Sequence, residues 1–175
     1  KLLRDSIWSR CYGAVCTSAT LTAFGRFERF FERAGLRDIT AVRIPSPFDF
    51  QNIASFTVPA MNSDPRNFSE HSAEVAALLP DLLQEDPSAL VLFTSWRQMH
   101  EGVGKLPEGF RAKLKIQGDG SKQALLADHR RSVDAGDPSY IIGLASFAEG
   151  VDLPDDYCRH VVIVKLPFSV PDDPV

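Results

Sequence analysis

The second half of the chain alternates between short apolar runs and longer stretches with a helical pattern. The runs of strand length lie at residues 89–94 (ALVLFT), 112–116 (AKLKI), 140–145 (YIIGLA) and 160–166 (HVVIVKL), and helices are expected between them at 96–106 and 121–135. Near-continuous apolar strands separated by helices are typical of a parallel sheet that is covered on both faces. The sequence therefore predicts an α/β fold, with a parallel β-sheet flanked by helices on both faces.

The first half has a weaker pattern. Short strands are expected at residues 13–17, 39–44 and 53–59, with a proline-containing loop at 45–52. A helix capped by Ser69 is expected to run to about Gln84, with a kink at Pro80. A second helix is expected at 24–36, ended by Gly35. One side of it carries a mainly aromatic stripe, which we expect to pack in a core rather than to stack on bases. The stripe comprises Phe24, Phe27, Phe30, Phe31 and Ala34.

Length and composition exclude several classes of protein. The 175 residues suffice for one domain with its own core, and no apolar run reaches the roughly 20 residues of a membrane-spanning helix, so no membrane partner is expected. The net charge of -4 argues against binding of nucleic acid through the overall charge of the chain. It does not exclude a local strip of basic side chains that contacts phosphates. Three cysteines, without disulfide or zinc spacing, are expected to be reduced in a cytoplasmic protein. Because Lys1 stands where a Met would begin a chain, a fragment of a longer protein is expected.

Polar residues follow three of the predicted strands. They are Thr94, Ser95 and Trp96 after the first, 117–120 (QGDG) after the second, and 146–152 after the third. In a parallel sheet these points lie along one edge, where the ligands of open α/β folds bind, so one extended ligand can touch all three. Helix-start amides and hydroxyls suit phosphates, but helix caps and turns use the same residue types.

Several single residues, inside and outside these segments, allow two interpretations each. Gly150 permits a positive φ or a close backbone approach, and Asp152 either binds a ribose hydroxyl or belongs to a turn. Trp96 either stacks on a base or packs at a helix start. Ser18 and Thr20 either contact a phosphate or cap a helix. Several basic side chains either contact phosphates or form solvated surface: Arg97, Lys122, Arg130 and Arg131.

Other chemical motifs are absent from the sequence. No phosphate loop of the G-x-x-x-x-G-K-[ST] type occurs, Gly118 and Gly120 make no dinucleotide fingerprint, and the four histidines have no metal-ligand spacing.

Four short segments in order resemble a known series. These are TSATL (17–21), VLFTSW (91–96), QGDG (117–120) and EGVDLP (149–154). The series resembles the second, RecA-like motor domain of superfamily 2 DNA helicases of the DinG branch, relatives of the XPD-like iron–sulfur helicases. By this resemblance residues 1–22 are the end of the first motor domain or a connector, and residues 23–175 are the second domain, truncated at its C-terminal end.

The resemblance also implies roles for individual residues. Ser18, Ala19 and Thr20 match motif III, which couples hydrolysis to DNA movement. Thr94 and Ser95 match motif IV, near the DNA backbone, and with them Trp96 and Gln117 are expected to face DNA. In the motif V match, Ser146 would lie near a DNA phosphate, while Glu149, Gly150 and Asp152 would contact the nucleotide, with Asp152 near the ribose.

The activity that the resemblance implies is ATP-driven translocation on single-stranded DNA, with duplex unwinding in DNA repair or replication. The first motor domain of the same chain would share ATP and Mg²⁺ with this one, and an iron–sulfur cluster is possible in the parent protein but not in this piece. Phosphoryl transfer needs a phosphate cradle, Mg²⁺ ligands and an arginine together, so the 175 residues alone are expected to be inactive. The alternative is a nucleotide-binding or regulatory α/β module without motor activity, because fold alone does not choose a function.

Overall fold

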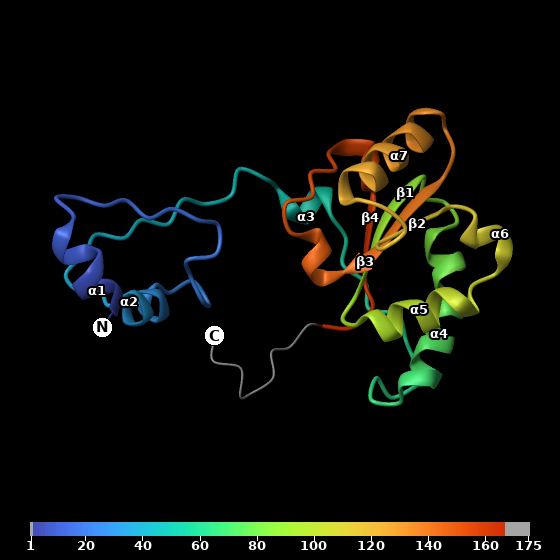
Figure 1. Ribbon diagram of the computed structural model, residues 1–175, viewed down its shortest axis with the longest axis horizontal. Helices are drawn as coiled ribbons and strands as arrows, with labels where there is room; N and C mark the ends of the chain where they lie inside the picture. The colour runs from blue at the N-terminus through green and yellow to red at the C-terminus, as the bar shows by residue number, and fades with distance from the viewer. Residues whose placement is uncertain (1, 167–175) are drawn as a thin grey trace. The chain divides into compact units, whose positions relative to one another are not determined.

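The computed structural model describes residues 2–166, and the chain divides into two compact units, residues 1–57 and 58–175. Each unit is described by itself below. Figure 1 shows the elements of both units along the chain. The predicted boundary between motor domains, after residue 22, stays a prediction.

The second unit is built on a four-stranded sheet in the order β2-β3-β1-β4. The strands are β1 (Ser88–Phe93), β2 (Leu114–Ile116), β3 (Ser139–Leu144) and β4 (His160–Ile163). All three pairings are parallel, and Val91 of β1 lies opposite Ile142 of β3 and Val162 of β4. The predicted α/β class with a parallel sheet is therefore confirmed.

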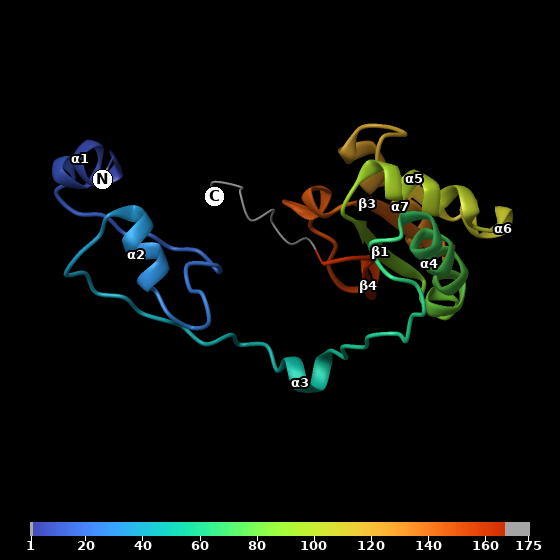
Figure 2. The same ribbon diagram turned by 90° about the horizontal axis from the view of Figure 1, so that it is seen from below.

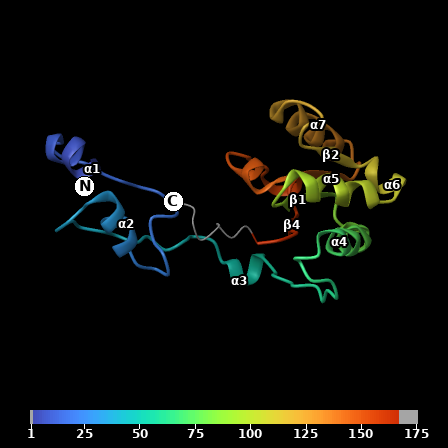
Figure 3. The ribbon, with the colours of Figure 1, turned by 60° about the horizontal axis from the view of Figure 1, so that its bottom comes forward.

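Successive residues of the central strands point to opposite faces of the sheet and enter different cores. Val91 and Ile142 pack with α4 (Phe68–Leu83) and α5 (Trp96–Lys105), whereas Leu90 and Ile141 pack with Leu125 of α7 (Lys122–Asp134). Figure 3 shows α7 above the strands and α4 below them. Helices therefore cover both faces, as predicted, and each central strand is buried on both sides.

Two of the four α-helices in the described part of this unit begin with a side-chain cap, and α4 and α6 (Glu108–Arg111) do not. Ser95 accepts a hydrogen bond from the amide of Gln98 at 3.3 Å, and Ser121 accepts one from Ala124 at 3.2 Å, so both are N-caps. The prediction for α4 was wrong by two positions, because the helix begins at Phe68 after Asn67 and includes Ser69. The helix also runs through Pro80 without ending there.

Three further elements join the strands and helices of the second unit. They are the short helix α6 (Glu108–Arg111), which the sequence pattern did not indicate, and the 3-10 turns η2 (Ala145–Ala148) and η3 (Asp155–Tyr157). The two 3-10 turns shape the chain between β3 and β4, which includes the predicted motif V segment.

The first unit is helical and extended rather than β-structured (Figure 2). It contains α1 (Leu2–Ser6), η1 (Trp8–Arg10), α2 (Glu28–Ala34) and α3 (Phe50–Ile53), the last within the predicted loop and its end. The strands predicted at 13–17, 39–44 and 53–59 are wrong, because none of these residues joins the sheet and Ile53 is the last residue of α3. Val15 and Val42 are 94% and 73% exposed, so the described part of the unit supplies no partner strand for their backbone groups.

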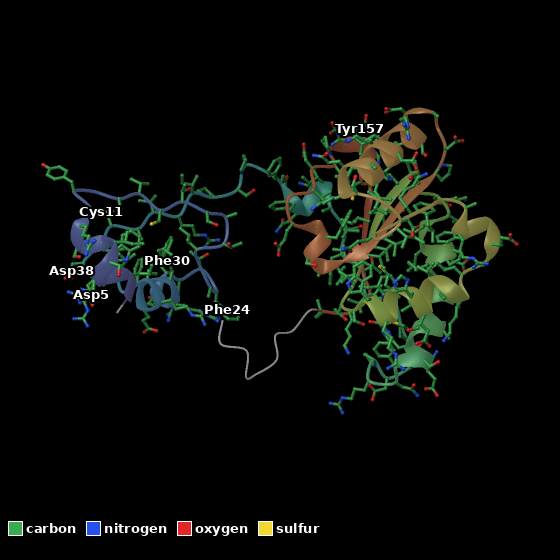
Figure 4. The ribbon with its side chains drawn as sticks, in the orientation of Figure 1. Asp5, Cys11, Phe24, Phe30, Asp38 and Tyr157 are labelled. Atoms are coloured by element: carbon green, nitrogen blue, oxygen red, sulfur yellow. The ribbon has the colours of Figure 1, made fainter. Side chains whose placement is uncertain are left out.

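The aromatic stripe of the first unit is partly confirmed as core. Phe27 and Phe31 stack at 5.8 Å between ring centroids, and the indole of Trp8 donates a 2.6 Å hydrogen bond to the carbonyl of Ala34. Phe24 is exposed and precedes α2, as the side-chain view shows (Figure 4). Gly35 ends the helix with a φ of 69°, the left-handed conformation that glycine adopts most readily.

Among residues 2–166, no helix is long and apolar enough to cross a membrane.

The layered packing predicts that substitutions in a central strand destabilise the unit more than substitutions in the edge strand. Ile142→Ala removes a side chain that is fully buried against α4 and α5 and should lower the free energy of unfolding by about 2–5 kcal/mol. Ile163→Ala on the edge strand β4, where the side chain is 51% exposed, should cost less than about 1.5 kcal/mol. Urea denaturation followed by circular dichroism measures both, and equal losses would contradict the layer assignment.

A charge cluster between α7 and β2 predicts a pH dependence. Lys115 of β2 lies 2.6 Å and Arg131 2.8 Å from the Asp128 carboxylate, and together they lower the pKa of Asp128 from 3.8 to about 2. The stabilisation is therefore present above about pH 4 and is lost as the pH falls to about 2, because protonation removes the charge that the folded state favours. Asp128→Asn should reduce stability at neutral pH.

The difference in denaturation midpoint between wild type and Asp128→Asn, measured across this pH range, should shrink to zero at the acid end. A difference that stays constant down to about pH 2 would rule out the ion pairs as its cause.

Candidate functional site

The carboxyl ends of β2, β3 and β1 lie side by side, because these strands are neighbours in a parallel sheet. A pocket of about 390 Å³ opens at these ends. Its lining residues come from the starts of α5 and α7 and from the segments after β2 and β3; they are Trp96, Gln117, Gly118, Gly120, Lys122, Ser146 and Phe147. The structure thus brings together three residues predicted to face DNA, from three separate stretches of sequence.

Trp96 supplies the aromatic wall of this pocket. Its side chain is 44% exposed and stacks on His100 at 5.7 Å between ring centroids, so part of the indole remains open. Gly118 has a φ of 108°, and a Cβ built on it would lie 3.5 Å from the indole ring. The glycine therefore permits a backbone conformation that other residues adopt rarely, directly beside the tryptophan.

Gln117 has a structural role at the pocket floor. Its side-chain Oε1 accepts a 2.8 Å hydrogen bond from the backbone amide of Leu144. The backbone amide of Gln117 donates to the carbonyl of Ile142, also at 2.8 Å. A Cβ on Gly143 would lie 3.0 Å from the Phe147 ring and 3.1 Å from Gln117 Oε1. Glycine at position 143 is what allows the end of β3, Phe147 and Gln117 to approach one another.

Ser146 and Lys122 supply the polar wall. Ser146 is exposed in η2, while Phe147 beside it is buried. The ammonium of Lys122 lies 5.0 Å from the centroid of the Phe147 ring and donates a 2.5 Å hydrogen bond to the carbonyl of Glu149. A cation, a hydroxyl and an open indole face at one pocket suit a ligand with a phosphate and a planar ring.

The predicted nucleotide contacts follow the pocket along the chain rather than lining it. Glu149, Gly150 and Asp152 are all exposed, and Gly150 has a φ of 67°. The positive φ agrees with the expected need for glycine at this position. Arg130 of α7 donates a 2.7 Å hydrogen bond to the carbonyl of Asp152, so the carboxylate is not the group that holds this turn.

Thr94 and Ser95 are tied to the start of α5. Besides the Ser95 cap, the Thr94 hydroxyl donates to Oε1 of Gln98 at 3.5 Å, and Nε2 of Gln98 donates to Nδ1 of His71 at 2.9 Å. His71 and Gln98 are each 2% exposed, and burial, followed by the charge of Lys165, lowers the pKa of His71. The histidine is thus the neutral acceptor of a buried network that no sequence signal had indicated, since residues 71 and 98 are on different helices.

Ser18, Ala19 and Thr20 lie in the first unit. The hydroxyl of Ser18 accepts a 3.2 Å hydrogen bond from the amide of Thr20 and lies 3.2 Å from its hydroxyl. The helix-cap interpretation is wrong, since α2 begins only at Glu28; the serine instead closes a local turn. Their proposed coupling role stays a prediction.

The four basic residues that the sequence analysis assigned either to phosphate contacts or to solvated surface fall into two groups in the structure. Arg97 lies 5.0 Å from the Phe68 ring centroid, and Arg131 is exposed and paired with Asp128. Lys122 and Arg130 instead hold backbone carbonyls of the segment after β3, a function that the sequence did not reveal. Residues 2–166 contain no group of three side chains that could hold a metal ion.

Comparison with known proteins adds two findings. Residues 80–175 match the family described as the helicase C-terminal domain. Over 99% of its length the chain is 36% identical to a Photobacterium profundum protein and 34% identical to proteins of Salmonella typhimurium and Escherichia coli, each named ATP-dependent DNA helicase DinG. The chain spans about a quarter of the length of these relatives.

The close approach at Gly143 predicts a sharp effect of one methyl group. Gly143→Ala should destabilise the unit by about 1–3 kcal/mol, because the new Cβ meets Phe147 and Gln117 inside ordinary contact distance. Gly104→Ala is the matched control: nothing lies within 4 Å of that Cβ, and its position in α5 should make alanine stabilising by about 0.5–1 kcal/mol. Thermal denaturation compares the two, and a neutral Gly143→Ala would contradict the described packing.

Proposed function

The chain belongs to the helicase C-terminal domain family, as its motifs indicated, and from this premise we propose that it is the second motor domain of an ATP-dependent DNA helicase. The parent protein would couple ATP hydrolysis to movement along single-stranded DNA and to unwinding of duplex DNA, in repair or replication. The names of its relatives, ATP-dependent DNA helicase DinG, support the ATP-dependent DNA helicase part of this proposal.

One observation supports the DNA part most directly: three strand ends that are distant in sequence share one pocket with an open indole, a cation and a hydroxyl. We propose that Trp96 stacks on a base and that Ser146 donates to a phosphate. Thr94, Ser95 and Gln117 would keep the strand ends in position rather than contact the DNA with free side chains. Their side chains already form hydrogen bonds with Gln98 or with the backbone of Leu144. Stacking and phosphate contact tolerate any base sequence, as a translocating motor requires.

The nucleotide would bind at the adjacent segment, where Glu149, Gly150 and Asp152 are exposed. We propose that Asp152 accepts hydrogen bonds from the ribose, and that another motor domain of the same protein supplies the phosphate loop and the Mg²⁺ ligands. Ser18, Ala19 and Thr20 would transmit hydrolysis to DNA movement. A cytoplasmic location belongs to the same proposal.

The aromatic contact is tested by substitution in the full-length protein. Trp96→Ala should weaken binding of a single-stranded oligonucleotide by about 1–3 kcal/mol, because one stacking contact is lost, while Trp96→Phe should retain most of the affinity. Fluorescence anisotropy at one fixed salt concentration measures both. Equal affinities for all three proteins would refute the stacking role.

A second variant shows whether an exposed positive charge away from the pocket also contributes to DNA affinity. Arg111→Met removes an exposed cation at α6, away from the pocket lining, and should leave the affinity at that salt concentration within about twofold.

The 175-residue chain alone is predicted to hydrolyse no ATP, because its sequence lacks the phosphate loop that phosphoryl transfer requires. A coupled phosphate-release assay on the purified chain, with and without single-stranded DNA, measures this. ATP hydrolysis that persists through further purification would overturn the division of the site between two domains.

A further inference from the structure

One face of α7 carries a series of polar side chains that hold the chain between residues 149 and 157. The series consists of Lys122, His129, Arg130 and Asp134, at intervals of seven, one and four residues. The intervals of seven and four align Lys122 with His129 and Arg130 with Asp134. These two rows lie next to each other, because one residue turns the helix by about 100°. The segment that they hold contains the proposed nucleotide contacts Glu149 and Asp152.

Lys122 and Arg130 bind this segment through its backbone. Lys122 donates to the carbonyl of Glu149 at 2.5 Å, and Arg130 donates to the carbonyl of Asp152 at 2.7 Å. Each cation also lies over an aromatic ring: Lys122 is 5.0 Å from the ring of Phe147, two residues before the segment, and Arg130 is 5.5 Å from the ring of Tyr157, at its end. Four contacts thus anchor the segment at both ends of its Glu149–Asp152 stretch.

The acidic side chains of that stretch are left unused. Within residues 2–166, neither the Glu149 nor the Asp152 carboxylate joins a salt bridge, although each residue has a cation bonded to its own carbonyl. Both residues are exposed. The cations therefore fix the backbone and leave both carboxylates available to a ligand.

The rest of the segment is fixed by His129 and Asp134. Nε2 of His129 donates to the carbonyl of Tyr157 at 2.7 Å, and its Nδ1 accepts from the hydroxyl of Ser139 at 2.9 Å, in keeping with the buried, neutral ring whose pKa burial lowers. The Tyr157 hydroxyl donates to Asp134 at 2.9 Å, and Figure 4 shows Tyr157 beside this helix. Beyond Asp152, His129 and Asp134 thus hold Tyr157 in addition to the contact of Arg130 with its ring.

We propose that Lys122 and Arg130 are positioning residues that hold the Glu149–Asp152 turn, through its carbonyls, in the conformation that presents both carboxylates to the nucleotide. This inference rests on the proposed function for its nucleotide part. Ordering a backbone before the ligand arrives removes an entropic cost from binding, so the effect falls on nucleotide affinity rather than on the chemical step.

Two measurements on the full-length protein test the proposal. Arg130→Met should raise KM for ATP in the DNA-stimulated ATPase by about tenfold and leave kcat within about twofold, as expected for loss of one hydrogen bond from a charged donor that aids binding alone. Amide hydrogen exchange without nucleotide should become faster at residues 149–153 and stay unchanged in β1. Lys122→Met should act in the same direction.

The chain offers a conservative rescue and a matched control. Within the described residues, Nε of Arg130 is buried without a partner, and Nη2 makes the hydrogen bond, so Arg130→Lys can reproduce that bond and should restore KM to within about threefold of wild type. Arg131→Met removes the neighbouring cation, whose described contact is with Asp128, and should change neither KM nor exchange at 149–153.

Three outcomes would overturn the proposal: an unchanged KM in Arg130→Met, a fall in kcat as large as the rise in KM, or an equal effect of Arg131→Met. A wild-type protein without ATPase would refute the proposed function instead. In that case the exchange measurement, which needs no nucleotide, still decides whether the two cations hold the turn.

Discussion

Parallel pairing of β3 with β1 on one side and β2 on the other is the constraint on which the site depends. Because parallel strands end at the same edge, it collects Trp96, Gln117 and Ser146 at one pocket from positions up to 50 residues apart. Burial on both faces holds this arrangement, since Ile141 and Ile142 are each fully buried against different helices. The pocket is a consequence of strand order, and glycine at 143 makes the approach of Phe147 and Gln117 possible.

The helix α7 links this sheet to the segment that follows β3. On its sheet side Leu125 packs on Ile141, and Asp128 pairs with Lys115 of β2. Farther along its surface, cations hold backbone carbonyls beyond the pocket. A hydrogen bond from a charged donor to a carbonyl constrains the backbone without neutralising the neighbouring carboxylates. The stability of the sheet and the proposed presentation of the carboxylates therefore depend on the same helix.

Much of the second unit could be predicted from sequence, and most of the first could not. Continuous apolar strands such as ALVLFT are recognisable because burial on both faces demands them. The run GAVCT at 13–17 is also mostly apolar, but the described residues of its unit supply no partner strand, and the local sequence does not show whether a partner exists. The family resemblance rested on four short motifs, three of which, VLFTSW, QGDG and EGVDLP, lie within the residues that match the family.

The site was predictable in its location but not in its internal bonds. Strand ends mark the ligand edge of any parallel sheet, so Trp96 and Ser146 could be named in advance. The bonds of Lys122 and Arg130 to carbonyls, and of Gln98 to His71, depend on which helices face which loops. Only the packing of the helices shows these contacts, because nothing in the sequence indicates that residue 71 meets residue 98 or that residue 130 meets residue 152.

The proposed DNA-binding edge at the three strand ends can be tested by photocrosslinking. The full-length protein is crosslinked to an oligonucleotide that carries 5-iodouracil, and the crosslinked peptides are mapped. Crosslinks are expected in peptides that contain Trp96 and in peptides that contain Phe147, and excess unlabelled single strand should suppress both. Crosslinks confined to other parts of the second unit, such as α4 or β4, would contradict the proposed edge.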